Sequence, residues 1–288
     1  MILITGATGF IGKNLVKSLS NENIICLVRK SSNIKLLKEL KIKLAYGDLT
    51  DKNSLDKSLK NITTVIHLAA AISINKEELK NVNLIGTKNL IQSCEKNNVK
   101  KIIVLSSMAA TRKYLDNYGK SKKIVERLVK ESKLNYTILR PTLVYGENSN
   151  SLQHIINHLK KFPFIIPLIG KGKSYLQPVD VKDVVKVIIT SINKKPENKT
   201  YNLLGGTKIT MNYFMDMISS RLNLKKIKIH VPTSVVLTIV SFFRMFYKNF
   251  PISIEFVKSM DQDVQGTNKD AEKDFNIKFK KLSESFQF

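Results

Sequence analysis

Ser107, Tyr118 and Lys122 are the residues whose types and spacing could do chemistry together. Tyr118 and Lys122 stand four positions apart in a segment with helical patterning, so both side chains project from one face of that helix. A tyrosine hydroxyl has a pKa of about 10 and is a poor base unless nearby positive charge stabilises its phenolate. Ser107 follows an apolar run that predicts a strand, where a hydroxyl can bond a substrate oxygen. The three residues predict acid–base chemistry on an alcohol or a carbonyl.

A second motif, a glycine-rich segment, lies directly after the first predicted strand. It reads Thr5-Gly6-Ala7-Thr8-Gly9-Phe10-Ile11-Gly12 and opens a predicted helix. Glycines between a strand and a helix let the chain turn sharply and let the backbone approach a pyrophosphate, which the helix N-terminus also attracts. The segment therefore predicts a dinucleotide site, as its position is more specific than a glycine trio alone.

These motifs need elements that bring them together, and the chain supplies an alternation of apolar runs and helical stretches up to about Arg140. Short apolar runs separated by helices are typical of a parallel sheet covered on both faces. We expect strands at Ile2–Thr5, Ile24–Val28, Lys43–Tyr46, Thr64–His67, Lys101–Ser106 and Tyr136–Leu139. We expect helices near Ile11–Ser20, Asn33–Leu40, Ser54–Leu59, Lys76–Asn97 and Tyr118–Ser132.

The fold class predicted is α/β, a Rossmann-type doubly wound parallel sheet with a smaller C-terminal substrate-binding subdomain. The nucleotide-binding core is expected over residues 1–145. The subdomain is expected over residues 146–288, with some segments returning to the core. Further helices are predicted near Val181–Ile192 and Met211–Leu222.

The Gly-x-x-Gly-x-x-Gly spacing resembles that of the extended short-chain dehydrogenase/reductases, the NAD-dependent epimerase/dehydratase group. The similarity continues over nearly the whole chain in four further segments: Gly47–Leu49, Val65–Ala70, Asn83–Leu90 and Leu139–Gly146. In this family the tyrosine moves the alcohol proton, and the lysine also holds the nicotinamide ribose. The resemblance implies that Ser107, Tyr118 and Lys122 are catalytic, with Ser107 a better match than Ser106.

The resemblance also implies a set of cofactor-binding residues, in which Asp48 accepts from the adenine amino group. The full set is Gly6, Thr8, Gly9, Phe10, Ile11, Gly12, Arg29, Asp48, Leu49, Leu68, Ala69, Ala70, Lys122 and Pro141. A turn or a helix cap is the alternative role for Asp48. The second strand ends in Arg29-Lys30-Ser31-Ser32, where NAD-specific proteins carry an acidic residue, and cations there suit a 2′-phosphate. NADP(H) is therefore favoured and NAD(H) is the alternative.

The substrate site departs from the family pattern. Only ten residues separate Ser107 from Tyr118, and Leu176 or Gln177 stands where nucleotide-sugar enzymes carry an arginine. Lys171 and Lys173 could replace its charge but lack its bidentate fork. The expected substrate-binding residues are Ser107, Tyr118, Asn148 and Gln177.

Composition limits the remaining options. The net charge is +25, carried mainly by lysines spread along the chain, and no nucleic-acid-binding module accompanies it, so we expect a small-molecule substrate and no nucleic acid. The two cysteines are expected to be buried thiols in a cytoplasmic protein. His154 and His158 lack a third ligand, and no metal is expected. The apolar stretch Val235–Phe246 is too short to span a bilayer and predicts a helix that packs on the core or lies in a membrane surface.

Three functions remain. The first is an epimerase or dehydratase acting on a nucleotide- or lipid-linked sugar. The second is an NADP-dependent reductase or dehydrogenase of a hydrophobic alcohol or ketone, which the missing arginine and Val235–Phe246 favour. The third is a non-catalytic NADP-binding accessory subunit. By resemblance, a homodimer is expected through the helices near Lys76–Asn97 and Tyr118–Ser132.

Overall fold

A parallel sheet forms the centre of the molecule. The computed structural model describes the chain except for residues 74, 163, 195–197, 248–251 and 287–288. Seven strands pair in parallel, in the spatial order β11 (Lys199–Leu203), β6 (Asn135–Pro141), β5 (Lys101–Leu105), β4 (Thr64–His67), β1 (Ile2–Thr5), β2 (Ile24–Val28) and β3 (Lys43–Tyr46). The order reverses between β1 and β4, which is where doubly wound sheets bind ligands beyond the carboxyl ends of their strands.

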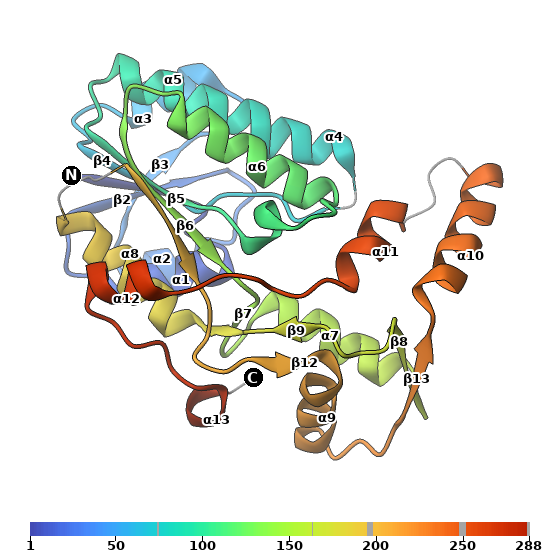
Figure 1. Ribbon diagram of the computed structural model, residues 1–288. Helices are drawn as coiled ribbons and strands as arrows, with labels where there is room; N and C mark the ends of the chain where they lie inside the picture. The colour runs from blue at the N-terminus through green and yellow to red at the C-terminus, as the bar shows by residue number, and fades with distance from the viewer. Residues whose placement is uncertain (74, 163, 195–197, 248–251, 287–288) are drawn as a thin grey trace.

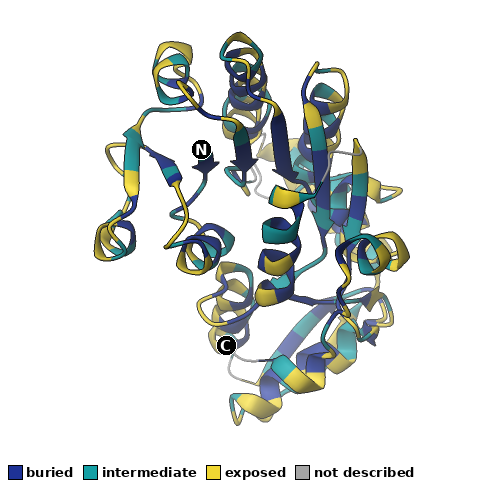
Figure 2. Ribbon diagram, turned by 90° about the vertical axis from the view of Figure 1, so that its left-hand side faces the viewer, coloured by how far each residue is buried: buried dark blue, intermediate teal, exposed yellow. Residues whose placement is uncertain are grey.

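Helices cover both faces of the sheet (Figure 1). One hydrophobic core lies under α1 (Phe10–Ser18), α2 (Lys35–Glu39), α8 (Val181–Asn193) and α12 (Lys269–Phe275). The other lies under α3 (Lys52–Ser58), α5 (Gly86–Lys96) and α6 (Asn117–Lys130). Figure 2 shows the strands buried between these helices, whose outer faces are exposed. Burial on both faces explains the continuous apolar runs of the strands.

Two short helical segments connect β4 and β5 to the helices that follow them. A short α4 (Lys76–Glu78) runs into a π-helix, η1 (Leu79–Ile85), and then into α5. A 3₁₀ turn, η2 (Met108–Thr111), follows β5 and leads towards α6. Both lie next to the site residues described below, where single π-helical turns are often found.

The C-terminal part builds a smaller unit around a third hydrophobic core. Its strand pairs are β7 (Val144–Tyr145) with β10 (Val179–Asp180), β9 (Tyr175–Leu176) with β12 (Ile209–Thr210), and β8 (Ile165–Ile169) with β13 (Ile227–Val231). Its helices are α7 (Asn150–Lys161), α9 (Met211–Arg221), α10 (Thr233–Phe246), α11 (Ile254–Met260) and α13 (Leu282–Ser285).

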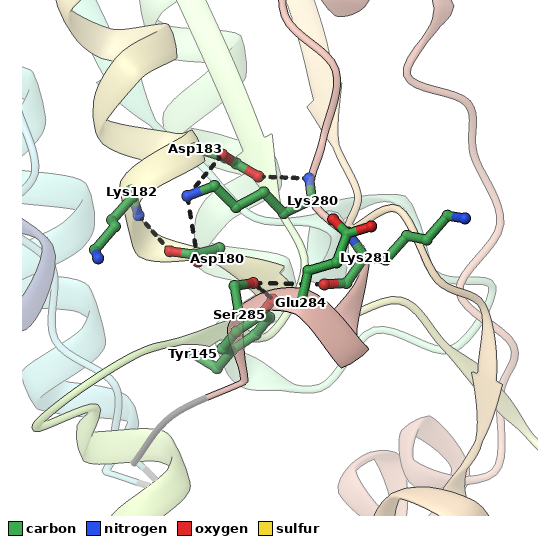
Figure 3. Close-up of polar contacts among 8 residues, drawn as sticks. All are labelled: Tyr145, Asp180, Lys182, Asp183, Lys280, Lys281, Glu284 and Ser285. Carbon is green, nitrogen blue, oxygen red and sulfur yellow. Dashed lines mark hydrogen bonds and ion pairs between the residues drawn. The ribbon is translucent and has the colours of Figure 1, made fainter.

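The C-terminal residues Lys280 to Ser285 connect this unit to the core by hydrogen bonds and ion pairs (Figure 3). Asp180 and Asp183 are both 4% exposed, and the Lys280 ammonium lies 3.7 Å and 3.8 Å from their carboxylates. The Lys280 backbone N–H donates to Asp183 at 2.8 Å, and the Tyr145 hydroxyl bonds Ser285 at 2.7 Å. These contacts join β7, the start of α8 and the C-terminal segment.

The predicted fold class is confirmed, and the expected strands agree with the observed ones to within two residues at each end. The helix expected near Lys76–Asn97 is divided into α4, η1 and α5. β11, α8 and α12 return from the C-terminal half to the central sheet. Both cysteines are buried free thiols, as expected.

Candidate functional site

The glycine-rich turn after β1 packs against the turn after β4. Gly6 has φ +74°, and a Cβ at this position would lie 2.5 Å from the Ala69 nitrogen. A Cβ on Gly12 would overlap the carbonyl of Gly6. Gly9 caps α1, and its own Cβ would meet only the Gly6 carbonyl, at 3.3 Å. The surface of this turn is therefore made of backbone atoms, and no side chain of the described residues caps the N-terminus of α1 at Gly9, where an anion can bind.

A cavity of about 490 Å³ lies over this turn, at the carboxyl ends of the central strands. Nine of the predicted cofactor residues line it: Gly6, Thr8, Gly9, Arg29, Asp48, Leu49, Leu68, Ala69 and Ala70. Phe10 and Ile11 instead pack against the core, while Gly12, Lys122 and Pro141 lie outside its lining. The glycine cradle and the helix N-terminus fit a dinucleotide.

Arg29 and Asp48 lie on the side of this cavity formed by β2 and β3. Asp48 Oδ1 accepts bonds from the N–H and the hydroxyl of Thr50, at 2.9 Å and 2.8 Å. Asp48 therefore has the turn role considered for it. Among the described residues, none bonds its Oδ2, which is left for a ligand. Arg29 is exposed, and its backbone N–H donates to the hydroxyl of Ser32 at 3.2 Å. No carboxylate of the described chain forms an ion pair with Arg29.

A buried imidazole links β1, β4 and α5 beneath the cavity. His67 Nδ1 lies 2.7 Å from the hydroxyl of Thr5, and Nε2 lies 3.0 Å from that of Thr87. Burial, with the positive charge of Lys122, lowers the pKa of His67 to about 3. The ring is neutral at physiological pH and holds the strand ends in place, so it is no proton shuttle.

Tyr118, Lys122 and Glu126 follow one another at four-residue spacing along α6. The Lys122 ammonium donates to the Leu105 carbonyl at 2.8 Å and lies 5.9 Å from the centre of the Tyr118 ring. Burial lowers the pKa of Lys122 to about 8, although Glu126 opposes this effect. Burial raises the pKa of Tyr118 to about 12. Tyr118 is therefore protonated in the ligand-free protein, and base chemistry needs further positive charge.

The two serines after β5 have different partners. Ser107 caps η2, and its hydroxyl accepts from the Ala109 N–H at 3.1 Å. A side-chain hydrogen bond with Ser107 also favours the ionised form of Tyr118 and so lowers its pKa against the effect of burial. Ser106 donates to the buried Glu126 at 2.5 Å. Ser107, rather than Ser106, is brought to Tyr118.

An ion pair fixes the angle of α6 to the sheet. Arg140, on β6, donates through Nε and Nη2 to the two oxygens of Glu126, at 2.7 Å and 2.5 Å. Glu126 is 4% exposed, so this bidentate pair ties the middle of α6 to the ends of two strands. The tyrosine and the lysine are held in register with the serine.

Asn83 performs a similar task from η1. Its side chain accepts from the Ala71 N–H at 2.7 Å and donates to the Ala71 carbonyl at 3.1 Å and to the Ser121 hydroxyl at 3.0 Å. Asn83 is 2% exposed. It joins the chain after β4, which lines the cofactor cavity, to the residue preceding Lys122.

A second cavity of about 490 Å³ begins at Met108, the neighbour of Ser107. It is lined by Met108, Thr111–Tyr114, Lys173, Ser174 and Asp261–Gln265. Arg112 is half-buried there, and among the described residues its guanidinium makes no hydrogen bond and no ion pair within 4.0 Å. Asp116 nevertheless favours its charged form, against the effect of burial on its pKa. Arg112 can receive an anionic group.

The other substrate expectations fall in different places. Gln177 donates to the Gly205 carbonyl at 3.2 Å and is not among the residues lining either cavity. Asn148 is exposed, with φ +63°, in the turn before α7. Lys173 lines the second cavity, whereas Lys171 does not. His154 and His158 are exposed, and no group of three or more potential metal ligands occurs within the described residues.

The sequence motifs alone do not identify the positions of Arg112 and Asn83 beside the two cavities. Arg112 lies in the short segment between Ser107 and Tyr118, and nothing in the local sequence distinguishes it from the many other cations of the chain. Asn83 opens the Asn83–Leu90 segment, but its role depends on Ala71 and Ser121, which are distant in sequence.

Comparisons with known proteins agree with this geometry. A model of the "NAD dependent epimerase/dehydratase family" matches residues 2–203. The N-acetyl-alpha-D-glucosaminyl-diphospho-ditrans,octacis-undecaprenol 4-epimerase of Escherichia coli O157:H7 is 28% identical over 258 residues, covering 80% of this chain and 75% of that protein.

Two further similarities extend over most of the chain. The decarboxylating sterol-4-alpha-carboxylate 3-dehydrogenase of Dictyostelium discoideum is 24% identical over 281 residues, covering 86% of this chain and 85% of that protein. The crystal structure of gox2253 superposes with a TM-score of 0.82 at 23% identity, covering 99% of this chain and 95% of the other. The structural likeness shows the fold.

Proposed function

Because the chain belongs to the NAD dependent epimerase/dehydratase family and is an enzyme of the extended short-chain dehydrogenase/reductase class, we propose that it oxidises or reduces a carbon bearing a hydroxyl or a carbonyl, with Ser107, Tyr118 and Lys122 as its catalytic residues. The arrangement that carries this proposal is the single face of α6 that presents Tyr118 beside Ser107, with the Lys122 ammonium 5.9 Å from the tyrosine ring.

The roles of the three residues follow from their surroundings. The nicotinamide, when bound, exchanges hydride with the reacting carbon. Tyr118 gives its proton to the oxygen of a carbonyl that is being reduced, or takes one from an alcohol that is being oxidised. Ser107 bonds the same oxygen and orients it. Lys122 and the positive charge of an oxidised nicotinamide lower the pKa of Tyr118 towards neutrality when it acts as a base.

The proposed cofactor is NADP(H), with NAD(H) as the alternative. The support is Arg29, an exposed cation at the end of β2 that lines the cofactor cavity, with Ser32 beside it. A 2′-phosphate would find a charge-assisted bond there. Arg29→Ala should weaken NADPH binding by about tenfold and leave NADH binding unchanged, with Lys17→Ala, on the exposed side of α1, as the control. Tighter binding of NADH than of NADPH by the wild type would contradict the preference.

The proposed substrate is a sugar carried on a diphosphate, attached to a nucleotide or to a lipid, and the reaction is an epimerisation or a dehydration. The Escherichia coli relative supports the lipid-linked form by its name. Arg112, with Lys113 and Lys173 lining the same cavity, supports an anionic substrate and supplies the guanidinium that position 177 lacks. Gln177 and Asn148 remain substrate-binding predictions.

A second candidate is an NADP-dependent dehydrogenase or reductase of a hydrophobic alcohol or ketone. The observation that favours it is the exposed apolar surface of α10, together with a sterol dehydrogenase among the relatives. Homodimerisation through α5 and α6, and a cytoplasmic location, also stay predictions. No helix within the described part of the chain is long and apolar enough to cross a membrane.

The test incubates the purified chain with each cofactor and with nucleotide-linked sugars, lipid-linked sugars and hydrophobic ketones. Nicotinamide absorbance and product chromatography are followed for wild type, Tyr118→Phe and the control Tyr213→Phe, which alters an exposed tyrosine on α9. Sugar conversion without net cofactor change, lost only in Tyr118→Phe, supports the epimerase or dehydratase. Net oxidation of NADPH supports the second candidate, and cofactor binding with no turnover supports an accessory subunit.

A further inference from the structure

α10 exposes an apolar stripe. Of its fourteen residues, only Val240 is buried. Val235, Ile239, Phe242 and Phe246 are 45%, 47%, 58% and 65% exposed. Their spacings of four, three and four residues place them on one face of the helix. Scattered exposed apolar residues are ordinary, but a continuous stripe marks an interaction surface.

α10 stands at the edge of the molecule. It follows β13 and packs against α11, and Figure 1 shows it beyond α11, away from the central sheet. The expectation that this segment packs on the core is therefore wrong for most of its surface. At 1.5 Å per residue, the helix is about 21 Å long, short of the roughly 30 Å of a bilayer's hydrocarbon core. It can lie in a membrane surface but cannot cross it.

The charge of the chain selects the occupant of this stripe. A second copy would bring its own +25 charges against the first, which opposes self-association through this face. An acidic lipid surface is attracted by the same charge. Lys113 and Lys258 each lie within about 5.6 Å of the centre of the Tyr114 ring, which lines the same cavity as Asp261, and Arg244 is in the last turn of α10. Exposed apolar side chains on a strongly cationic protein fit an anionic bilayer.

The stripe is joined to the substrate cavity. Thr233, the first residue of α10, donates through its hydroxyl to Asp261 at 2.9 Å. Asp261 lines the cavity, as do Lys113 and Tyr114. The same cavity begins at Met108, next to the catalytic Ser107. A surface that holds α10 would therefore lie at the rim of the substrate site.

We propose that α10 docks its Val235, Ile239, Phe242 and Phe246 face into the surface of an anionic bilayer, and that the cavity rim at Asp261 then receives a substrate anchored in that bilayer. The second half of this proposal rests on the proposed function, and the docking itself does not.

The docking is tested by co-sedimentation of the full chain with vesicles. The vesicles are phosphatidylcholine alone, or phosphatidylcholine mixed with phosphatidylglycerol, and the variants are the double change Phe242→Asp with Phe246→Asp, and the control Tyr213→Asp on α9. We expect wild type and control to bind the acidic vesicles about tenfold more strongly than the double variant, with binding that weakens in high salt. Equal binding by the double variant, or no binding by wild type, overturns the proposal.

Two further measurements separate the possible failures. Size-exclusion chromatography of wild type and double variant detects a dimer held by this face, and a dimer that only the double variant disrupts, without vesicle binding, overturns the proposal in favour of a second copy. Tyr118→Phe should bind vesicles as wild type does while losing turnover. Vesicle binding without turnover in wild type would leave docking supported and would contradict the proposed function instead.

Discussion

The two cavities, of similar volume, are built by different means. At the turns after β1 and β4 the first cavity is walled by backbone, because a Cβ on Gly6 would meet the Ala69 backbone, while side chains such as Arg29 and Asp48 line its other side. The second cavity, the proposed substrate site, is lined by η2, the segment after it, Lys173, Ser174 and the 261–265 segment, which lie far apart in sequence. The glycine turn of the first cavity leaves no room for an added Cβ at Gly6 or Gly12, whereas the second cavity can change its lining without altering the sheet.

Three amide side chains that make the same pair of hydrogen bonds differ in how far they are buried. Each accepts from the backbone N–H of a distant residue and donates to its carbonyl: Asn83 with Ala71, Asn268 with Leu204, and Gln262 with Tyr114. Asn83 is buried beside the cofactor cavity, while Asn268 and Gln262 are only partly buried in the C-terminal segment. The bonding amide is buried in one region and partly exposed in the other.

The largest expected effect separates two glycines. Gly6→Ala places a Cβ against the Ala69 backbone at φ +74°, so the turn must shift, and we expect cofactor affinity to fall by about a hundredfold. A Cβ on Gly266 would meet side-chain atoms rather than backbone, the end of Met108 at 3.1 Å, the Asn202 amide at 3.3 Å and Leu204 at 3.5 Å, so Gly266→Ala should leave cofactor affinity unchanged. Fluorescence titration with NADPH, with circular dichroism as a folding control, measures both. Equal losses would show that the two regions are alike.

The second effect concerns the buried ammonium of Lys122. The pKa of Lys122 is about 8 in the folded chain, against 10.5 for a solvated lysine. The unfolded chain binds more protons between these pH values, so wild type should gain stability relative to Lys122→Met as pH rises from 8 to 10.5, by at most about 3 kcal/mol. Urea unfolding at several pH values measures it, with the exposed Lys120→Met as control. A difference that stays constant across this window would contradict the burial of the charge.

The amide pairs give the next effect. Asn83→Ala leaves the N–H and carbonyl of Ala71 without their buried partner, and we expect a loss of about 2–3 kcal/mol in unfolding free energy. Asn268→Ala removes equivalent bonds to Leu204, which is 1% exposed, but the Asn268 side chain is itself partly exposed, so water can enter the space it leaves and the loss should be about 1 kcal/mol. Urea denaturation compares the two variants. A larger loss in Asn268→Ala would reverse the proposed ranking of the regions.

The smallest effect is expected at the substrate cavity. Gln262→Ala frees the backbone of Tyr114, whose N–H donates to Gln262 at 2.9 Å, and should change stability by less than about 1 kcal/mol. Hydrogen exchange of the Tyr114 amide should accelerate, while NADPH affinity stays at the wild-type value. A loss of NADPH affinity would show that the two cavities are coupled.

The sequence determined the features that depend on neighbouring residues. Apolar runs and helical spacing marked the strands and helices, since both periodicities are local. The Gly6–Gly12 segment marked the cofactor turn, and the four-residue spacing of Tyr118 and Lys122 placed both on one face of α6.

Tertiary structure alone decided what lies between distant segments. Arg112 lines one cavity together with the 261–265 segment, about 150 residues further along the chain, and β11, from the C-terminal half, forms one edge of the sheet. The apolar pattern of Val235–Phe246 is the same for a helix that packs on a core and for one that faces outwards. Only the positions of α11 and the cavity rim decide between them, because burial depends on which surfaces the rest of the chain brings near, and no local pattern contains that information.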